Sequence, residues 1–260
     1  MIRTTWRSEI PSTFGPISVR GSGPNSGAAH AVIVLHGMDR SANRYHRQAA
    51  EAMPDAIVLA PEFDAMRFPG WRSYNLARMT DADGRAVGES RTLYPALETL
   101  IEYARGLSED VSIYGHSAGA QLLQRWALFR PHGLIGARLA VANAGWFTEP
   151  DPMIPFPYGL AVAPLTADLA GALALPLHIF VGEDDASEDH HALRRDAGAD
   201  RQGLNRKARA VFLLNSARRV ASRFGFDCNW SLTMTPGAGH SNAEMIRAAA
   251  PILLAPGTLG

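Results

Sequence analysis

The chain has 260 residues, of which 47% are hydrophobic and 19% charged, and its 25 basic residues balance its 25 acidic ones. This apolar content excludes a disordered chain, and we expect one folding unit over residues 1–260, because large α/β sheets commonly reach this size. A neutral chain has no general attraction for a phosphate backbone, so we expect no nucleic-acid partner. The single cysteine, Cys228, excludes an internal disulfide and any site built from several cysteines.

The sequence shows neither a secretion signal nor a membrane span. Its first residues are polar and include Arg3, Arg7 and Glu9, so they lack the apolar stretch of a secretory signal. The least polar long segment, 160–180, is interrupted by prolines and by Asp168 and is too broken to cross a bilayer. We therefore expect a cytoplasmic protein without membrane partners, and the composition leaves the oligomeric state open.

In chain order, short apolar runs alternate with longer segments of helical period. This pattern is typical of an α/β protein whose mostly parallel sheet has crossover helices on both faces. The predicted elements are an edge hairpin over 5–10 and 16–20, a strand over 31–35, a helix over 43–53, a strand over 56–60, a helix over 90–106, a strand over 111–114, a helix over 118–129, strands over 139–142 and 177–181, a helix over 206–224, a strand over 230–235 and a helix over 242–250.

Two segments break this alternation. Segment 147–166 contains too many prolines for a long helix, and we interpret it, together with the residues up to about 175, as a small Pro-rich lid. Segment 187–205 is polar and contains Gly198 and Gly203, which favours a surface connection. The prolines of the first segment are Pro150, Pro152, Pro155, Pro157 and Pro164.

A G-x-S-x-G motif, Gly115-His116-Ser117-Ala118-Gly119, joins the predicted strand 111–114 to the predicted helix 118–129. A serine on such a sharp turn is held in a strained conformation with its hydroxyl exposed, and the glycines avoid collisions with the neighbouring strand and helix. The sequence therefore indicates a nucleophile at Ser117. The alternative is that Ser117 only caps the helix.

A serine hydroxyl needs a histidine as base and a carboxylate that orients this histidine. His240 ends a glycine-rich loop, 236–240, after the last predicted strand, and we expect it to be the base. Glu183, Asp184 and Asp185 follow the strand 177–181 at the carboxyl end of the sheet, where open α/β folds place their sites. One of these carboxylates should orient His240.

The order of serine, acid and histidine along this chain resembles that of the α/β-hydrolase superfamily. The resemblance extends from the His36-Gly37 turn to His240 and implies an α/β-hydrolase fold. Within the superfamily the chain is similar to esterases and polyhydroxybutyrate-depolymerase-like hydrolases. The motifs that carry this likeness are Leu35-His36-Gly37-Met38, Pro61-Glu62-Phe63, Gly115-His116-Ser117-Ala118-Gly119-Ala120 and Asn143-Ala144-Gly145-Trp146.

The resemblance also implies roles for individual residues. The acid of this family commonly lies three residues after the glycine that closes its strand, which favours Asp185 over Asp184. The backbone amides of Met38 and Ala118 are the implied oxyanion hole. Candidate substrate-binding residues lie near the expected site, although each could instead fix a loop or pack in the interior: Arg40, Tyr45, Trp146, Phe147 and Tyr158.

Other titratable groups have simpler interpretations. His116 inside the motif is expected to be a packing residue. Asp189, His190 and His191 lie in a polar loop without a further ligand at useful spacing, so we expect no metal. The basic residues of segment 194–223 could form an anion-binding face, but a solvated helix surface is the preferred interpretation.

We therefore expect a serine hydrolase, without cofactor, that acts on a small-molecule or oligomeric carboxylic ester. Ser117 would form an acyl-enzyme, His240 would move the proton, and Asp185 would orient His240. Two alternatives remain: the same residues could act on an amide, thioester or C–C bond, or the protein could be a noncatalytic binding protein of the same fold.

Overall fold

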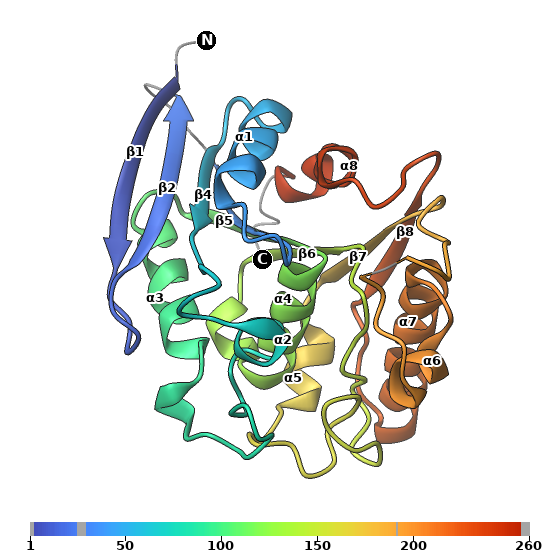
Figure 1. Ribbon diagram of the computed structural model, residues 1–260. Coiled ribbons are helices and arrows are strands. Elements are labelled where there is room, and N and C mark those ends of the chain that lie inside the picture. The colour runs from blue at the N-terminus through green and yellow to red at the C-terminus, as the bar shows by residue number, and fades with distance from the viewer. Residues whose placement is uncertain (1–2, 25–29, 191, 256–260) are drawn as a thin grey trace.

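The computed structural model describes residues 3–24, 30–190 and 192–255. One sheet of eight strands runs through this part of the chain in the order β1-β2-β4-β3-β5-β6-β7-β8 (Figure 1). The strands are β1 (Arg3–Ile10), β2 (Ile17–Pro24), β3 (His30–Leu35), β4 (Ile57–Pro61), β5 (Asp110–His116), β6 (Arg138–Ala142), β7 (Leu177–Gly182) and β8 (Ser231–Thr235).

The first two strands form the predicted antiparallel hairpin, and β2 also pairs antiparallel with β4. All pairings from β4 to β8 are parallel. The carboxyl ends of these strands therefore meet at one edge of the sheet, which is where the loops after β5, β7 and β8 come together. The predicted mostly parallel sheet is confirmed.

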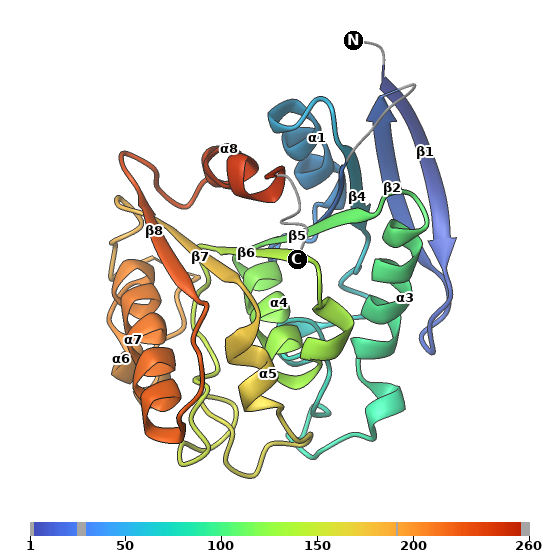
Figure 2. The same cartoon turned by 180° about the vertical axis from the view of Figure 1, so that it is seen from behind.

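Helices cover both faces of the sheet (Figure 1 and, from behind, Figure 2). On one face lie α1 (Ala42–Ala52) and α8 (Asn242–Leu253), which pack against each other. The other face carries α3, α4, α5 and α7. The remaining bounds are α2 (Gly70–Ser73), η1 (Glu89–Arg91), α3 (Tyr94–Arg105), α4 (Ala118–Phe129), η2 (Pro131–Leu134), α5 (Leu169–Ala174), α6 (Ala197–Gln202) and α7 (Arg206–Phe224).

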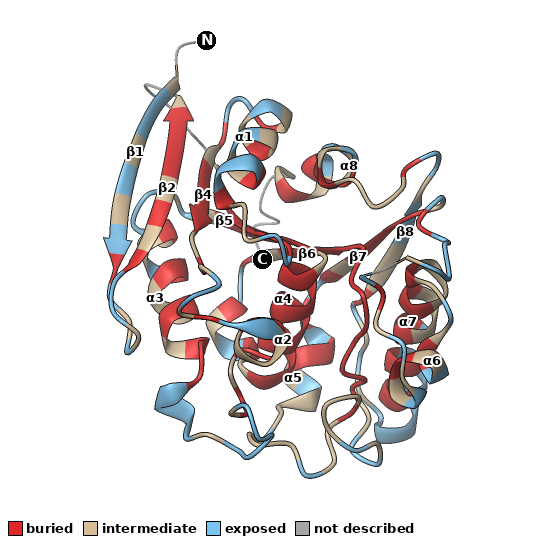
Figure 3. Cartoon of the chain, in the orientation of Figure 1, coloured by how far each residue is buried: buried red, intermediate tan, exposed pale blue. Residues whose placement is uncertain are grey.

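The central strands are buried on both sides, as Figure 3 shows. Successive side chains of a strand point to opposite faces, and in β3 this divides the core in two. Ile33 and Leu35 belong to the cluster under α3 and α4, whereas Val32 and Val34 belong to the cluster under α1 and α8. This double burial explains why these strands are continuous apolar runs in the sequence.

Short helices are the elements that periodicity failed to predict. The chain forms α5 inside the expected lid and α6 inside the expected surface connection. Each begins with an aspartate whose carboxylate accepts a backbone N–H three residues on: Asp168 from Gly171, and Asp196 from Ala199. A cap of this kind stabilises a helix of fewer than two turns, which is too short to show a hydrophobic period.

The expected lid over about 147–175 is not confirmed. The side chains of Thr148 and Glu149 are fully buried, and the Thr148 backbone exchanges hydrogen bonds with the amide of Gln124 on α4. The rest of the segment runs along the lower end of the molecule in Figure 1 and leads into α5. This Pro-rich segment therefore begins packed against α4 and α7. None of its residues lines the two cavities beside Ser117 that are described below.

Candidate active site

Ser117 occupies the turn between β5 and α4 with φ 55° and ψ −110°. A non-glycine residue in this region of backbone space costs about 1–3 kcal/mol and needs support from its surroundings. The support comes from β6, because the Ser117 amide donates to the carbonyl of Ala142 at 2.9 Å. The Ser117 side chain makes no cap hydrogen bond to α4, so the structure does not support a mere capping role.

The two glycines of the motif allow the close approach of three elements. A Cβ on Gly119 would lie 2.2 Å from the carbonyl oxygen of Leu35, and one on Gly115 would lie 2.4 Å from the carbonyl oxygen of Gly119. Neither position can accept a side chain without moving backbone. The turn therefore holds α4 directly against the end of β3, where the Gly37-Met38 loop begins.

A continuous hydrogen-bonded line joins the three residues of the expected triad. His240 Nε2 lies 3.2 Å from Ser117 Oγ, and His240 Nδ1 lies 2.7 Å from Asp185 Oδ2. With the Nδ1 proton donated to the carboxylate, Nε2 is left as the acceptor for the serine hydroxyl. Asp184, the alternative acid, is exposed, whereas Asp185 is buried.

The loops that carry Asp185 and His240 are bound to each other. The Asp184 amide donates to the carbonyl of Ala238 at 2.9 Å, and a Cβ on Gly182 would lie 2.1 Å from the same oxygen. Asn143, at the end of β6, connects both loops: its Oδ1 accepts from the Gly182 amide and its Nδ2 donates to the Gly239 carbonyl, each at 2.9 Å.

Arg206, the first residue of α7, contacts the acid from the other side. Its Nη1 donates to Asp185 Oδ1 at 3.1 Å, and both side chains are almost wholly buried. Burial acts to raise the pKa of Asp185, but the hydrogen bond and charge of His240 together with the charge of Arg206 lower it below its usual value. The acid is therefore held as a carboxylate.

The loop that carries Met38 is fixed by His36. His36 Nδ1 donates to the Gly37 carbonyl at 3.0 Å and its Nε2 accepts the Phe63 amide at 3.2 Å, so both ring nitrogens are used. The Tyr74 hydroxyl donates to the His36 carbonyl at 2.8 Å, and the two rings stack. Burial lowers the pKa of His36 to about 4, which keeps the ring neutral and structural.

Two cavities flank Ser117, and Met38 contributes to both. The first, which we call the polar cavity, has a volume of about 520 Å³, and its walls include Tyr45, His116, His190, His240 and Asn242. The second, which we call the tryptophan cavity, has a volume of about 330 Å³, and its walls include Trp71, Asn75, Gln121, Trp146, Arg194 and Arg206.

The structure places the expected substrate-binding residues in different surroundings. Tyr45 lines the polar cavity, where its hydroxyl lies 2.9 Å from His116 Nδ1, and Trp146 lines the tryptophan cavity. Arg40 lines neither cavity, because its guanidinium donates to the backbone carbonyls of Phe68 and Gly70 and fixes the loop.

Phe147 and Tyr158 also lie outside both cavities. Phe147 is buried in the main core and its amide donates to Gln202, while the Tyr158 hydroxyl contacts Asp196. These two aromatic residues pack the protein instead of lining the site. Trp146 lines a cavity whereas its neighbour Phe147 packs in the core, and the sequence does not distinguish the two residues.

His116 is buried beside His240, with ring centroids 4.9 Å apart. Burial, followed by the nearby charges of His240 and Arg206, lowers the pKa of His116 well below its usual value. It therefore remains neutral, as expected of a packing residue, and does not compete with His240 for the proton of Ser117.

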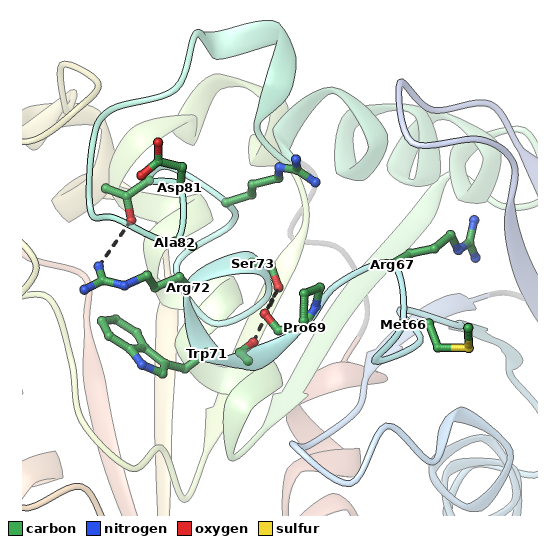
Figure 4. A pocket seen from close by; sticks show the side chains of 11 residues that line it. Met66, Arg67, Pro69, Trp71, Arg72, Ser73, Asp81 and Ala82 are labelled. Carbon is green, nitrogen blue, oxygen red and sulfur yellow. Dashed lines mark hydrogen bonds between the residues drawn. The ribbon is translucent and has the colours of Figure 1, made fainter.

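The two tryptophans that line the tryptophan cavity are packed against arginine side chains, of which Arg194 also lines the cavity. Arg72 and Arg194 lie over Trp71, with guanidinium carbons 4.5 and 4.2 Å from the ring centroid, and Arg194 and Arg125 lie near Trp146 at 5.0 and 4.2 Å. Trp71 also lines a further surface cavity of about 570 Å³ (Figure 4). This arrangement joins distant segments, and the sequence gives no local indication of it.

The remaining sequence expectations concern metals and membranes. Among the described residues, no cluster of three His, Cys, Asp or Glu side chains is arranged to hold a metal ion, and His191 lies outside the described residues. No helix in the described part of the chain has the length and apolar character needed to cross a bilayer.

Comparisons with known proteins give a clear result for structure. The chain matches no protein-family model and no curated protein. It is similar to the structure of poly(aspartic acid) hydrolase-1 from Sphingomonas sp. KT-1, with 30% identity over 96% of this chain and 98% of that one and a TM-score of 0.88. LpqC, a poly(3-hydroxybutyrate) depolymerase from Bordetella parapertussis, is 29% identical over 97% of this chain and 90% of its own, with a TM-score of 0.87.

The fold extends to more distant proteins. The siderophore hydrolase EstB from Aspergillus nidulans shares the fold at 13% identity, with a TM-score of 0.56 over 100% of this chain and 99% of its own. Together with the sheet order and the turn at Ser117, the match to the Sphingomonas enzyme shows that this chain belongs to the α/β-hydrolase superfamily, among its esterase-like members.

Proposed function

We propose that this protein is a serine hydrolase that cleaves carboxylic esters through an acyl-enzyme on Ser117. The observation that carries this proposal is the line of hydrogen bonds from Ser117 Oγ through His240 to Asp185 at the carboxyl ends of parallel strands. A noncatalytic binding protein would have no need for this geometry. The match to an ester-cleaving depolymerase at 29% identity supports the same reaction class.

In the proposed reaction, His240 Nε2 removes the proton of the Ser117 hydroxyl as its oxygen attacks the ester carbonyl. Asp185 holds the ring by Nδ1 and stabilises the imidazolium that forms. The tetrahedral intermediate collapses when His240 returns the proton to the departing alcohol. Water then attacks the acyl-enzyme by the same proton transfers in reverse order, releasing the acid and restoring Ser117.

The developing negative charge requires two donors. We assign this role to the backbone amides of Met38 and Ala118, because Met38 lines both cavities beside Ser117 and Ala118 begins α4 directly after it. The N-terminal end of α4 adds a partial positive charge at the same place. Such a donor typically contributes about 3 kcal/mol to the stabilisation of the transition state.

The two cavities give the substrate a direction. His240 must reach the leaving group in order to protonate it, and His240 lines the polar cavity but not the tryptophan cavity. The alcohol part of the ester therefore occupies the polar cavity. The acyl part occupies the tryptophan cavity, against Trp146 and Gln121.

The proposal is tested by labelling the purified protein with a fluorophosphonate and by measuring turnover of p-nitrophenyl esters of increasing acyl length. We expect the wild type to be labelled and the Ser117→Ala variant to be unlabelled, with kcat lower by about a thousandfold or more. Turnover should depend on acyl length, because the tryptophan cavity is small. Labelling that persists in folded Ser117→Ala would exclude Ser117 as the nucleophile.

A specific observation favours a second candidate, hydrolysis of an amide or ester in an acidic substrate. Arg194 lines the tryptophan cavity, and fully buried Arg125 lies behind Trp146. Among the described residues, Nε and Nη2 of Arg125 have no hydrogen-bond partner. Burial lowers the pKa of Arg125 to about 9, so it still carries its charge at neutral pH. These cations would favour a carboxylate on the acyl part, and the similar Sphingomonas protein is a hydrolase of poly(aspartic acid).

This second candidate is tested with a matched pair of substrates, p-nitrophenyl butyrate and the mono-p-nitrophenyl ester of glutaric acid. Arg194→Gln should lower kcat/KM for the anionic ester by about fivefold or more and leave the neutral ester unchanged. Arg195→Gln is the matched control, because its side chain is exposed and pairs with Asp200. Equal effects on both esters would show that Arg194 does not select charge.

A further inference from the structure

We propose that Arg206 is a positioning residue of the catalytic machinery, which holds the carboxylate of Asp185 in the plane that His240 requires and offsets part of its negative charge. This inference rests on the proposed function of Ser117, His240 and Asp185. It goes beyond that proposal because it adds a residue from a different element, the N-terminus of α7.

The geometry of Asp185 supports this role. One carboxylate oxygen, Oδ2, accepts from His240 Nδ1 at 2.7 Å, and the other, Oδ1, accepts from Arg206 Nη1 at 3.1 Å. The exposed fractions of the Arg206 and Asp185 side chains are 2% and 3%, so water does not compete for either oxygen. Rotation of the carboxylate would break one of these two hydrogen bonds. The Asp185 carboxylate is therefore held at both of its oxygens.

The position of Arg206 is not explained by helix stability. It is the first residue of α7, where a cation lies at the positive end of the helix dipole and is disfavoured. The turn is fixed independently by Asn205, whose Oδ1 accepts the Ala208 amide at 2.9 Å. Among the described residues, Asp185 is the carboxylate with which Arg206 forms an ion pair. The charge of Arg206 is thus directed at Asp185.

Electrostatics give Arg206 an effect on the base. Among the described residues, His240 has Asp185 at its Nδ1 and the rings of His116 and His190 at 4.9 and 5.6 Å. The other charged and titratable groups near it are Arg206 behind Asp185, Glu244, which accepts the Gly239 amide, and Asp39 and Arg44, which line the polar cavity. Without the guanidinium, Asp185 would attract a proton onto His240 more strongly. His240 would then lose its function as a base at a higher pH.

The test compares Arg206→Gln, Arg206→Lys and the control Lys207→Gln, which removes one charge from the next residue of the same helix. In Arg206→Gln we expect kcat/KM for p-nitrophenyl butyrate to fall by about tenfold or more, as for other groups that orient a reacting side chain from behind. The acid limb of its pH profile should move to higher pH by about half a unit or more. Lysine keeps the charge without the planar fork, so Arg206→Lys should retain the acid limb and recover only part of the rate.

A double-mutant cycle with Asp185→Asn separates action through Asp185 from a general structural effect. If Arg206 acts through Asp185, adding Arg206→Gln to Asp185→Asn should change kcat/KM by less than about threefold. Independent, multiplicative losses would overturn the proposal. A lower rate in Arg206→Gln with an unmoved acid limb would also overturn it, because packing alone would produce that result.

Titration of the His240 ring by NMR gives a readout that does not require ester hydrolysis. The ring should titrate at higher pH in Arg206→Gln than in the wild type, and an unchanged titration would contradict the proposal even if the substrate class is wrong. Absence of fluorophosphonate labelling in the wild type would instead count against the proposed function. If Arg206→Gln does not fold, Arg206→Lys takes its place in the test. An unchanged rate in Arg206→Lys would overturn the positioning role, because lysine keeps the charge but not the planar guanidinium.

Discussion

Asp184 and Asp185 are adjacent in the chain but have different surroundings. The loop after β7 turns back through a hydrogen bond from the Asp185 amide to the Gly182 carbonyl at 3.1 Å, which directs the Asp185 side chain inward. Asp184 is exposed on the same loop, and its backbone amide contributes by binding the Ala238 carbonyl. One residue thus supplies a carboxylate to His240, while its neighbour supplies only backbone to the loop.

This difference predicts the result of two matched substitutions. Asp185→Asn should lower kcat by about 10³- to 10⁴-fold, because an amide no longer holds His240 in the tautomer that leaves Nε2 free. Asp184→Asn should leave kcat within about twofold, because its side chain is exposed. Both variants are compared by ester turnover, with circular dichroism to verify folding. Similar losses in both would contradict the assignment of Asp185.

At the scale of elements, the site depends on how the ends of β6, β7 and β8 are joined. Asn143 has a positive φ of 50° and is 1% exposed, and its side chain binds the Gly182 amide and the Gly239 carbonyl. Its own amide donates to the Phe180 carbonyl at 3.0 Å. Asparagine tolerates the left-handed region better than most residues, so one side chain both makes the turn and connects the acid loop to the histidine loop.

Asn143→Ala should therefore lower both stability and activity. We expect the free energy of unfolding to fall by about 2 to 3 kcal/mol, because the buried Gly182 amide and the part-buried Gly239 carbonyl lose their partner and alanine is disfavoured at positive φ. Activity should fall through kcat, since His240 loses its connection to β6. Asn143→Gly is the informative control, because glycine relieves the backbone strain but lacks the same two side-chain hydrogen bonds. Urea unfolding and ester turnover check both values, and wild-type kcat in Asn143→Ala would exclude a role in aligning the loops.

At the scale of the whole molecule, burial of neutral histidines links folding to pH. His36 and His116 are both buried in the folded protein, and burial lowers the pKa of His36 to about 4 and that of His116 well below its usual value. In the unfolded chain a histidine titrates near about 6.5. Between these values the unfolded state binds protons that the folded state does not bind.

The free energy of unfolding should therefore decrease as the pH falls from about 6.5 to about 4. For His36 alone the loss over this window is about 3 kcal/mol. Above about pH 7 these groups should have no effect, because both states are neutral. Urea unfolding at a series of pH values measures the slope, and His36→Asn should make it shallower. A constant stability between about pH 7 and pH 4.5 would contradict this account.

The sequence by itself determined the fold class, because its evidence is local. Strands buried on both faces must be apolar runs, and helices such as α4 and α7 must repeat apolar residues at helical spacing. The sequence therefore predicts these strands and helices with bounds close to those in the structure. The nucleophile turn is also visible in the sequence because its G-x-S-x-G motif is contiguous, although the contact that requires Gly119 is made with Leu35 on β3. The choice of Asp185 came from a family resemblance, and the structure brings this residue to His240.

Only the tertiary structure decided which side chains surround these groups. Arg206 and Asn143 contact the triad loops from distant segments, and Gln121 meets Trp71 and Asn75 in one cavity although a long stretch of chain separates it from them. The Pro-rich segment suggested a lid, but burial of Thr148 and Glu149 fixes its start against α4 and α7. Contacts of this kind depend on how helices pack across the sheet, and that arrangement leaves no periodic pattern in the sequence.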